Sequence, residues 1–171
     1  MEIRVRRGRP ADGAAMEDIE AAADALLVER FGAADWPPPA TSHERASVPG
    51  FALIAEPIED ATARSRPVGF VHVLEIDGHA HLEQLSVLPS FGRRGIGRLL
   101  VHAAFAEAHN LGHRSITLRT FRDVPWNAPF YASCGFAETE PDSPFLRSLV
   151  DTETALALFK YGPRVQMTAA L

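Results

Sequence analysis

Residues 79–121 are predicted to form, in order, a strand, a glycine-rich turn, an amphipathic helix and a second strand, and this order constrains the fold more than any other feature. Apolar residues recur through the helix at three- and four-residue steps until Gly112 stops the pattern. They are Ile96, Leu99, Leu100, Ala103, Ala104, Ala108 and Leu111. Because parallel strands need a crossover connection, usually a helix, the segment predicts a local α/β arrangement.

The strand at 79–87 is also the second arm of a predicted β-hairpin. Residues 68–76 form the first arm, and Asp77-Gly78 between them tolerates the positive φ angles of a two-residue type I′ turn. Pairing Ile76 with His79 places Leu74 opposite His81, His72 opposite Glu83 and Phe70 opposite Leu85, all on one face. Three adjacent titratable side chains are thus expected on an otherwise apolar face. A β-bulge would shift the pairs nearest Leu85.

The rest of the chain predicts shorter elements around this unit. An amphipathic helix is expected from Asp12, which can cap it, to Phe31, because Gly32 ends its apolar pattern. Consecutive prolines lack amide donors and clash with a helical backbone, so residues 36–46 are expected to be a long loop. The other expected elements are strands at 2–5, 51–55, 156–159 and 165–167, a surface connection at 61–67, a short helix at 128–134 and a strand from residue 136.

Composition is typical of a globular chain and disfavours several classes of function. The 171 residues are 46% apolar and 23% charged, so we expect one domain over residues 1–171. No window approaches the roughly 18 apolar residues of a membrane helix, and a net charge of −5 offers no obvious basic surface for nucleic acid. The lone Cys134 cannot form an internal disulfide, and the first residues lack the apolar stretch of a secretory signal. A reducing cytoplasm is the expected compartment.

The turn before the central helix has the chemistry of a pyrophosphate site. A helix start exposes backbone N–H groups at the positive end of the helix dipole, and Gly95 and Gly97 let the backbone approach phosphate oxygens. Charged donors come from three arginines, Arg93, Arg94 and Arg98. The turn lacks the Lys-Ser or Lys-Thr of a Walker loop and the GxGxxG of a dinucleotide site, which disfavours nucleotide hydrolysis and hydride transfer. The alternative is a basic helix start that binds no ligand.

Two segments carry a resemblance to a known family. The first is Val87-Leu-Pro followed by Arg-Arg-Gly-Ile-Gly, and the second is Asn127-Ala-Pro-Phe-Tyr-Ala-Ser-Cys-Gly-Phe136. They resemble, in order and spacing, the pyrophosphate loop and the NxxFYxxxGF segment of the GNAT superfamily of N-acetyltransferases. Gly92 departs from the family, which usually has Gln or Arg there, and Arg93 is the nearest substitute. The resemblance covers residues 82–136 and implies a three-layer α/β fold, with a mixed, splayed central sheet and helices on both faces.

The resemblance also implies a site for acetyl-CoA as cosubstrate, with no metal. The backbone of residues 85–87 is expected to hydrogen-bond the pantetheine arm, the 93–98 turn to wrap the pyrophosphate, Asn127 to face the cofactor arm and Tyr131 to face its sulfur. The implied cofactor-binding residues are Leu85, Ser86, Val87, Arg93, Arg94, Gly95, Ile96, Gly97, Arg98, Asn127 and Tyr131.

Three residues are candidates for catalysis of acetyl transfer. Tyr131 is the candidate acid for the departing thiolate, because a phenol is protonated at neutral pH. Its alternative role is packing of a short helix. Glu83 is the candidate base, directly or through water, and family members also use the His81 position. The alternative for Glu83 is a structural ion pair with His72.

These observations predict an N-acetyltransferase that acetylates a small primary amine by direct transfer in a ternary complex. A protein lysine or N-terminal acetyltransferase and a non-catalytic acyl-CoA-binding module are the alternatives, and a homodimer stays open.

Trp36 is expected either to line the acceptor pocket or to plug the core. His102, His109 and His113 do not form a convincing zinc site, and Cys134 is expected to be a packing residue.

Overall fold

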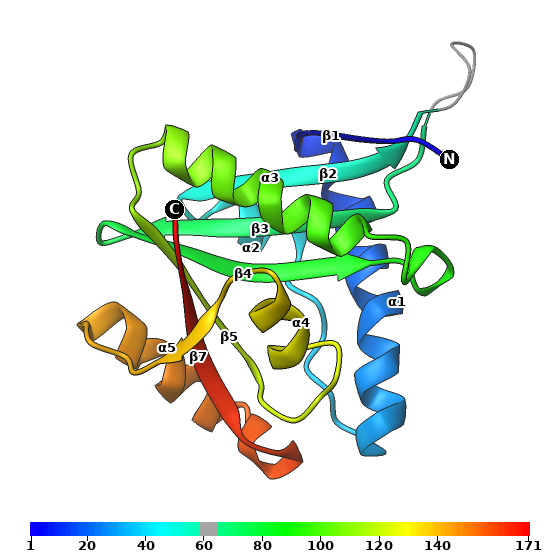
Figure 1. Ribbon diagram of the computed structural model, residues 1–171. Helices are drawn as coiled ribbons and strands as arrows, with labels where there is room; N and C mark the ends of the chain where they lie inside the picture. Colours follow the sequence, from blue (N-terminus) through cyan, green and yellow to red (C-terminus); the bar gives the residue numbers. More distant parts are fainter. Residues whose placement is uncertain (59–64) are drawn as a thin grey trace.

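The computed structural model describes residues 1–58 and 65–171, and its centre is a seven-stranded mixed sheet (Figure 1). The strands are β1 Ile3–Arg7, β2 Gly50–Pro57, β3 Gly69–Ile76, β4 His79–Val87, β5 Ser115–Phe121, β6 Ala137–Thr139 and β7 Arg164–Ala170. Their order is β1-β2-β3-β4-β5-β7-β6, and among these described strands only β4 and β5 pair in parallel. Most of the predicted surface connection, residues 61–64, lies outside the described residues.

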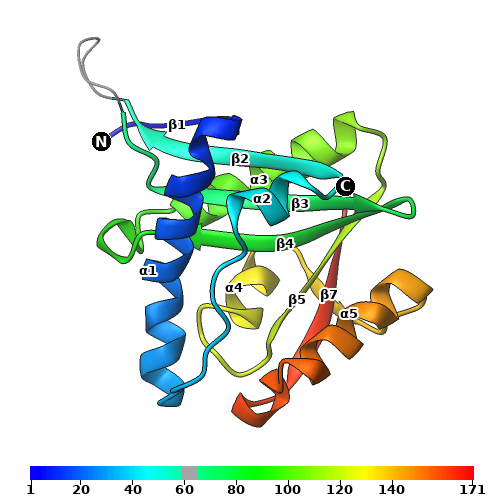
Figure 2. The same cartoon turned by 180° about the vertical axis from the view of Figure 1, so that it is seen from behind.

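Helices cover both faces of the sheet (Figures 1 and 2). One face carries α3 Ile96–Asn110 and α4 Ala128–Ser133, and we call it the α3 face. The other carries α1 Gly13–Phe31, α2 Ser42–Ala46 and α5 Pro144–Ala155, and we call it the α1 face. The three-layer α/β architecture implied by the resemblance is therefore confirmed.

The main core lies on the α3 face, between α3 and the sheet. Leu100, Val101 and Ala104 have no exposed surface, and they pack against the inward side chains of the central strands. Leu99 and Leu111 are 41% and 46% exposed, so the buried stripe of α3 is narrower than the sequence pattern predicts. A helix has 3.6 residues per turn, and these two leucines lie at the margins of its buried side.

The predicted hairpin is present, with φ of 51° at Asp77 and 78° at Gly78. The register agrees with the prediction through Leu74↔His81 and Val73↔Leu82 and then shifts by one residue. Beyond the shift, His72 is opposite Gln84 and Phe70 is opposite Ser86, so the predicted backbone pairs His72–Glu83 and Phe70–Leu85 are wrong. The reason is a β-bulge in which Glu83 is the extra residue of β4.

Two helices were absent from the sequence-based prediction. Residues 42–46 form α2 within the expected long loop, because Thr41 and Glu44 cap its first turn reciprocally. Residues 144–155 form α5, which begins after Ser143, whose Oγ accepts a hydrogen bond from Leu146 N at 3.2 Å. The strand predicted at 156–159 is wrong, since the chain there leaves α5 and enters a 3-10 turn at Leu158–Tyr161. The strand predicted at 165–167 lies within β7.

The sheet is splayed between β4 and β5, as the resemblance implied. The two strands pair only from Ala80–Leu82 to Ile116–Leu118 and then diverge (Figure 1). Beyond these pairs, no strand of the described residues neighbours this edge of β4. Within residues 1–58 and 65–171, no helix has the length and apolar character needed to cross a membrane.

Candidate active site

The free edge of β4 is the part of the sheet suited to an extended ligand. Its other edge stays paired to β3 as far as Val87↔Gly69, which holds Leu85, Ser86 and Val87 in an extended conformation. Backbone groups on an open strand edge can bind an amide-containing chain as an additional strand. The structure therefore fits a pantetheine arm along these three residues, although their binding role stays a prediction.

Glu83 lies on the α1 face beside His72, as the alternation of side chains from His81 predicts. His72 Nδ1 lies 2.9 Å from Glu83 Oε2, and Arg45 Nε lies 3.9 Å from the same oxygen. The predicted side-chain neighbours thus meet even though their backbone positions are not paired. The Glu83 side chain is 32% exposed, so its carboxylate is accessible as well as hydrogen-bonded.

Two further carboxylates, Glu20 and Asp24 of α1, lie close to Glu83 and were missed by the sequence analysis. Glu20 is paired with Arg45, yet burial raises the pKa of Glu20 to about 7. Burial also raises the pKa of Asp24, which accepts a hydrogen bond from Trp36 Nε1 at 3.1 Å. Their i, i+4 spacing puts them on one side of α1 next to the buried Ile19, and this was the available sequence signal.

His81 is buried at the last paired stretch of β4 and β5. Its Nδ1 lies 2.8 Å from Thr117 Oγ1, and its ring packs edge-on against Phe145 of α5. Thr117 Oγ1 also lies 3.5 Å from the Ala80 carbonyl oxygen, so Thr117 connects the His81 ring to the backbone of β4. Burial lowers the pKa of His81 to about 4, so the ring is neutral at neutral pH.

Tyr131 projects from α4 into a group of aromatic rings. Its ring centroid lies 5.2 Å from that of Phe130 and 5.7 Å from that of Phe136, both in edge-to-face contacts. Burial raises the pKa of Tyr131 above that of a free phenol, against the opposing charge of Arg164. The phenol is therefore protonated at neutral pH, as a proton donor must be. Asn127 caps the same helix without a side-chain capping bond among the described residues.

The pyrophosphate-loop candidate is a tight turn at the start of α3. Arg93 and Gly95 have φ of 60° and 80°, which orients the chain so that α3 begins at Ile96. A Cβ on Gly97 would lie 3.3 Å from Phe130 Cζ, so this glycine also permits close packing of α3 against α4. The loop fits an anion at the helix start, while direct phosphate contacts stay a prediction.

The three arginines of this loop have different environments. Arg98 donates to Ser133 O at 2.8 Å and to Ser133 Oγ at 2.9 Å, which ties α3 to the end of α4. The Arg94 guanidinium lies 5.4 Å from the centroid of the Phe91 ring, within cation–π range. Arg93 is exposed. Of the three arginines, Arg98 thus has a structural role, because it joins α3 to the end of α4.

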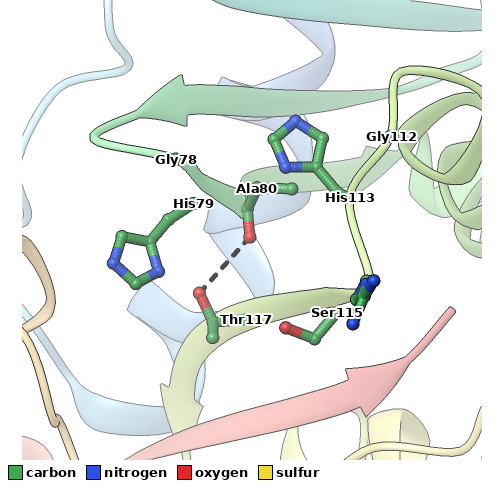
Figure 3. A pocket seen from close by; sticks show the side chains of 8 residues that line it. Gly78, His79, Ala80, Gly112, His113, Ser115 and Thr117 are labelled. Carbon is green, nitrogen blue, oxygen red and sulfur yellow. Dashed lines mark hydrogen bonds between the residues drawn. The ribbon is translucent and has the colours of Figure 1, made fainter.

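Two hollows lie away from the phosphate loop. One, of about 380 Å³, lies near the hairpin turn and is lined by His79, His113, Ser115 and Thr117 among others (Figure 3). The other, of about 400 Å³, lies between α1 and the proline segment, and its wall includes Trp36. Trp36 also packs against Phe31, Phe121 and Tyr161, an arrangement typical of a plug over the core.

In the described part of the chain, no cluster of three or more His, Cys, Asp or Glu side chains could hold a metal ion.

A valine at Gly95 is expected to weaken acetyl-CoA binding about tenfold or more, measured by calorimetry. The reason is conformational: no described atom lies within 4 Å of a Cβ at this position, but φ is 80°. Gly112→Val is the matched control, because Gly112 has φ of 93°, equally open surroundings and a position at the far end of α3. Equal binding by a well-folded Gly95→Val protein would remove the loop from the cofactor site.

Comparisons with known proteins agree with this geometry. The sequence model of the acetyltransferase (GNAT) family matches residues 20–136. The fold is similar to that of the PaiA N-acetyltransferase from Thermoplasma acidophilum in complex with coenzyme A, at 15% identity and a TM-score of 0.64, with all of both chains covered. It is also similar to the ribosomal-protein-S18-alanine N-acetyltransferase from Escherichia coli, at 17% identity and a TM-score of 0.67, covering 99% of this chain and 94% of that one.

A third similar structure is Rv2747 from Mycobacterium tuberculosis, described in a complex that contains CoA, at 19% identity and a TM-score of 0.64, covering 98% of this chain and 99% of that one. Its likeness, like the other two, extends over nearly the whole chain. Because the family match spans more than half of the sequence and includes the open edge of β4, the turn before α3 and Tyr131, the chain belongs to the GNAT family and is an acetyl-CoA-dependent acetyltransferase.

Proposed function

We propose that the protein acetylates the primary amine of a small molecule by direct transfer in a ternary complex. The observation that carries the proposal is the accessible carboxylate of Glu83, which follows Leu82, the last residue of β4 that pairs with β5. A base is needed there, because the attacking amine must lose a proton.

The proposed reaction uses Glu83 on the α1 face and Tyr131 on the α3 face of the sheet. The neutral amine attacks the thioester carbonyl, a C–N bond forms and the C–S bond breaks. Glu83 takes the proton that the nitrogen loses on attack, directly or through water, and the Tyr131 hydroxyl gives a proton to the departing thiolate. Proton exchange with solvent then returns Glu83 to the carboxylate and Tyr131 to the phenol. The neutral His81 is the alternative base. The products are the N-acetylated amine and CoA.

The cover over the α1 face favours a small acceptor. α1, α2 and α5 all lie on the face that carries Glu83 and His81 (Figure 2). The Arg45 guanidinium of α2 and the Phe145 ring of α5 contact these two residues. A small amine can reach Glu83 with less displacement of these helices than a folded protein would require. A protein acceptor is the second candidate, because one similar structure is named for a ribosomal-protein alanine.

An acceptor panel tests the proposal. Thioester consumption is expected to depend on an added small amine, and peptides with a free lysine or N-terminus are expected to be poorer acceptors. Consumption with the peptides alone would assign a protein acceptor. Acetyl-CoA binding by calorimetry without consumption for any acceptor would indicate a non-catalytic module.

A further inference from the structure

A buried cluster of charged side chains lies on the α1 face where β5 has left β4. It consists of Arg119 of β5, Glu153 of α5 and Arg164 of β7. Arg164 Nη2 donates to Glu153 Oε1 at 2.6 Å, and Arg119 Nε lies 3.0 Å from the same oxygen. The side chains of Arg119, Glu153 and Arg164 are 8%, 8% and 12% exposed. Two guanidinium groups therefore share one oxygen of a single buried carboxylate.

The cluster has one positive charge more than its carboxylate can neutralise. Arg119 Nε is close to Glu153 but not aligned to donate to it, and Arg164 Nε also has no hydrogen-bond partner among the described residues. Glu153 Oε2 is likewise without a partner in that part of the chain. The Arg164 guanidinium lies 4.4 Å from the Phe121 ring centroid, a contact that uses its flat face and not its N–H groups. Buried charges are normally paired and hydrogen-bonded, so the features that favour an anion are the net charge of +1 and the two Nε–H donors of the arginines. Besides Glu153 Oε2, the neighbouring Gln166 Oε1 is an acceptor without a partner in the described part of the chain.

The cluster lies on the same face of the sheet as Glu83 and His81, the two candidate bases for the acceptor amine. Arg119 follows Leu118, the last residue of β5 that pairs with β4, and its side chain lies on the same face as Thr117 and His81. Arg119 is also one of the charges that lower the pKa of His81, whereas Glu83 acts in the opposite direction. His81 is thus flanked by a negative group on β4 and a positive group on β5.

We propose that Arg119 and Arg164 bind a carboxylate of the acceptor, which makes the acceptor a small amino acid with its amine toward Glu83 and its carboxylate toward β5 and β7. The inference rests on the proposed function and narrows its substrate class. The planar guanidinium matches a carboxylate in shape and donor geometry. One excess positive charge matches a monoanion, which favours a carboxylate over a dianionic phosphate group.

The test compares acceptors with and without this negative charge. Free amino acids, their carboxamides and the corresponding amines without the carboxylate are assayed for thioester consumption. The free acids are expected to have a kcat/KM about 100-fold above the carboxamides, mainly through KM, because a buried charge-assisted hydrogen bond is lost in the amide. Arg119→Gln is expected to remove this preference by lowering kcat/KM for the acids alone, and Arg119→Lys to restore part of it.

Controls separate recognition from a structural role of the cluster. Arg122→Gln is matched, since Arg122 follows β5 directly and pairs with the exposed Glu138, and it should leave the preference unchanged. Arg164→Gln provides a second variant if Arg119→Gln does not fold. Equal use of acids and carboxamides by the unmodified protein would overturn the inference. So would an Arg119→Gln protein that loses both acceptor classes equally.

Binding gives a readout that does not depend on turnover. Amino acids are expected to raise the Tm of the CoA-bound protein and not that of its Arg119→Gln variant. Such a shift without acetyl transfer would contradict the proposed function and leave the carboxylate subsite standing. Transfer to amines with neither a carboxylate preference nor a Tm shift would contradict the subsite and leave the function standing.

Discussion

Replacing Tyr131 by Phe is expected to lower kcat about 100-fold while acetyl-CoA affinity changes little. The substitution keeps the edge-to-face contacts with Phe130 and Phe136 and removes only the hydroxyl. The loss arises because the departing thiolate no longer receives a proton in the transition state. Steady-state kinetics under conditions where chemistry limits the rate, together with calorimetry of acetyl-CoA, measures both quantities.

Tyr161→Phe is the matched control for this variant. Its hydroxyl donates to the exposed Asp35 at 2.9 Å, away from α4, and its loss is expected to leave kcat unchanged. If Tyr131→Phe retains full turnover, the hydroxyl has no catalytic role and Tyr131 serves only the packing of α4.

Glu83→Gln is expected to lower kcat/KM by at least about 100-fold and to abolish or displace the rising limb of its pH profile. This limb reports either the free-enzyme base or the free amine. His81 does not supply it near neutral pH, because its pKa is lowered to about 4 and the ring loses no further proton above pH 6. The measurement is kcat/KM from pH 5 to 9 for Glu83→Gln, His81→Asn and His72→Asn.

Glu75→Gln is the matched control for the Glu83 variant. Glu75 is also a strand glutamate hydrogen-bonded to a histidine, with His113 Nε2 at 2.9 Å, and its loss is expected to leave the profile unchanged. Full activity and an unchanged profile in Glu83→Gln, with both lost in His81→Asn, would make His81 the base. If none of the three variants alters the profile, the amine arrives already neutral.

Glu20 requires a separate variant in the same experiment. Its pKa of about 7 lies in the range of the expected limb, and its charge acts on the same cluster as Glu83. Glu20→Gln is expected to shift the limb without removing the activity, because Glu20 is buried against Arg45. A loss as large as that of Glu83→Gln would move the base assignment to Glu20.

Local patterns in the sequence predicted the elements that depend on neighbouring residues. Asp77-Gly78 determined the type I′ turn, since both residues accept positive φ. Gly32 and Gly112 marked where α1 and α3 end. The terminal segment was misread, because a short apolar run at 156–159 does not distinguish a strand from the end of a helix.

The sequence by itself determined β4, the turn that follows it and α3, and the motifs at 87–97 and 127–136 that indicate the family. Only the tertiary structure decided the electrostatics of the site. The burial of His81 and the shared carboxylate of Glu153 arise from residues far apart in the chain. Burial and pairing set these charges, and both depend on which strands and helices pack together, which local propensity does not encode.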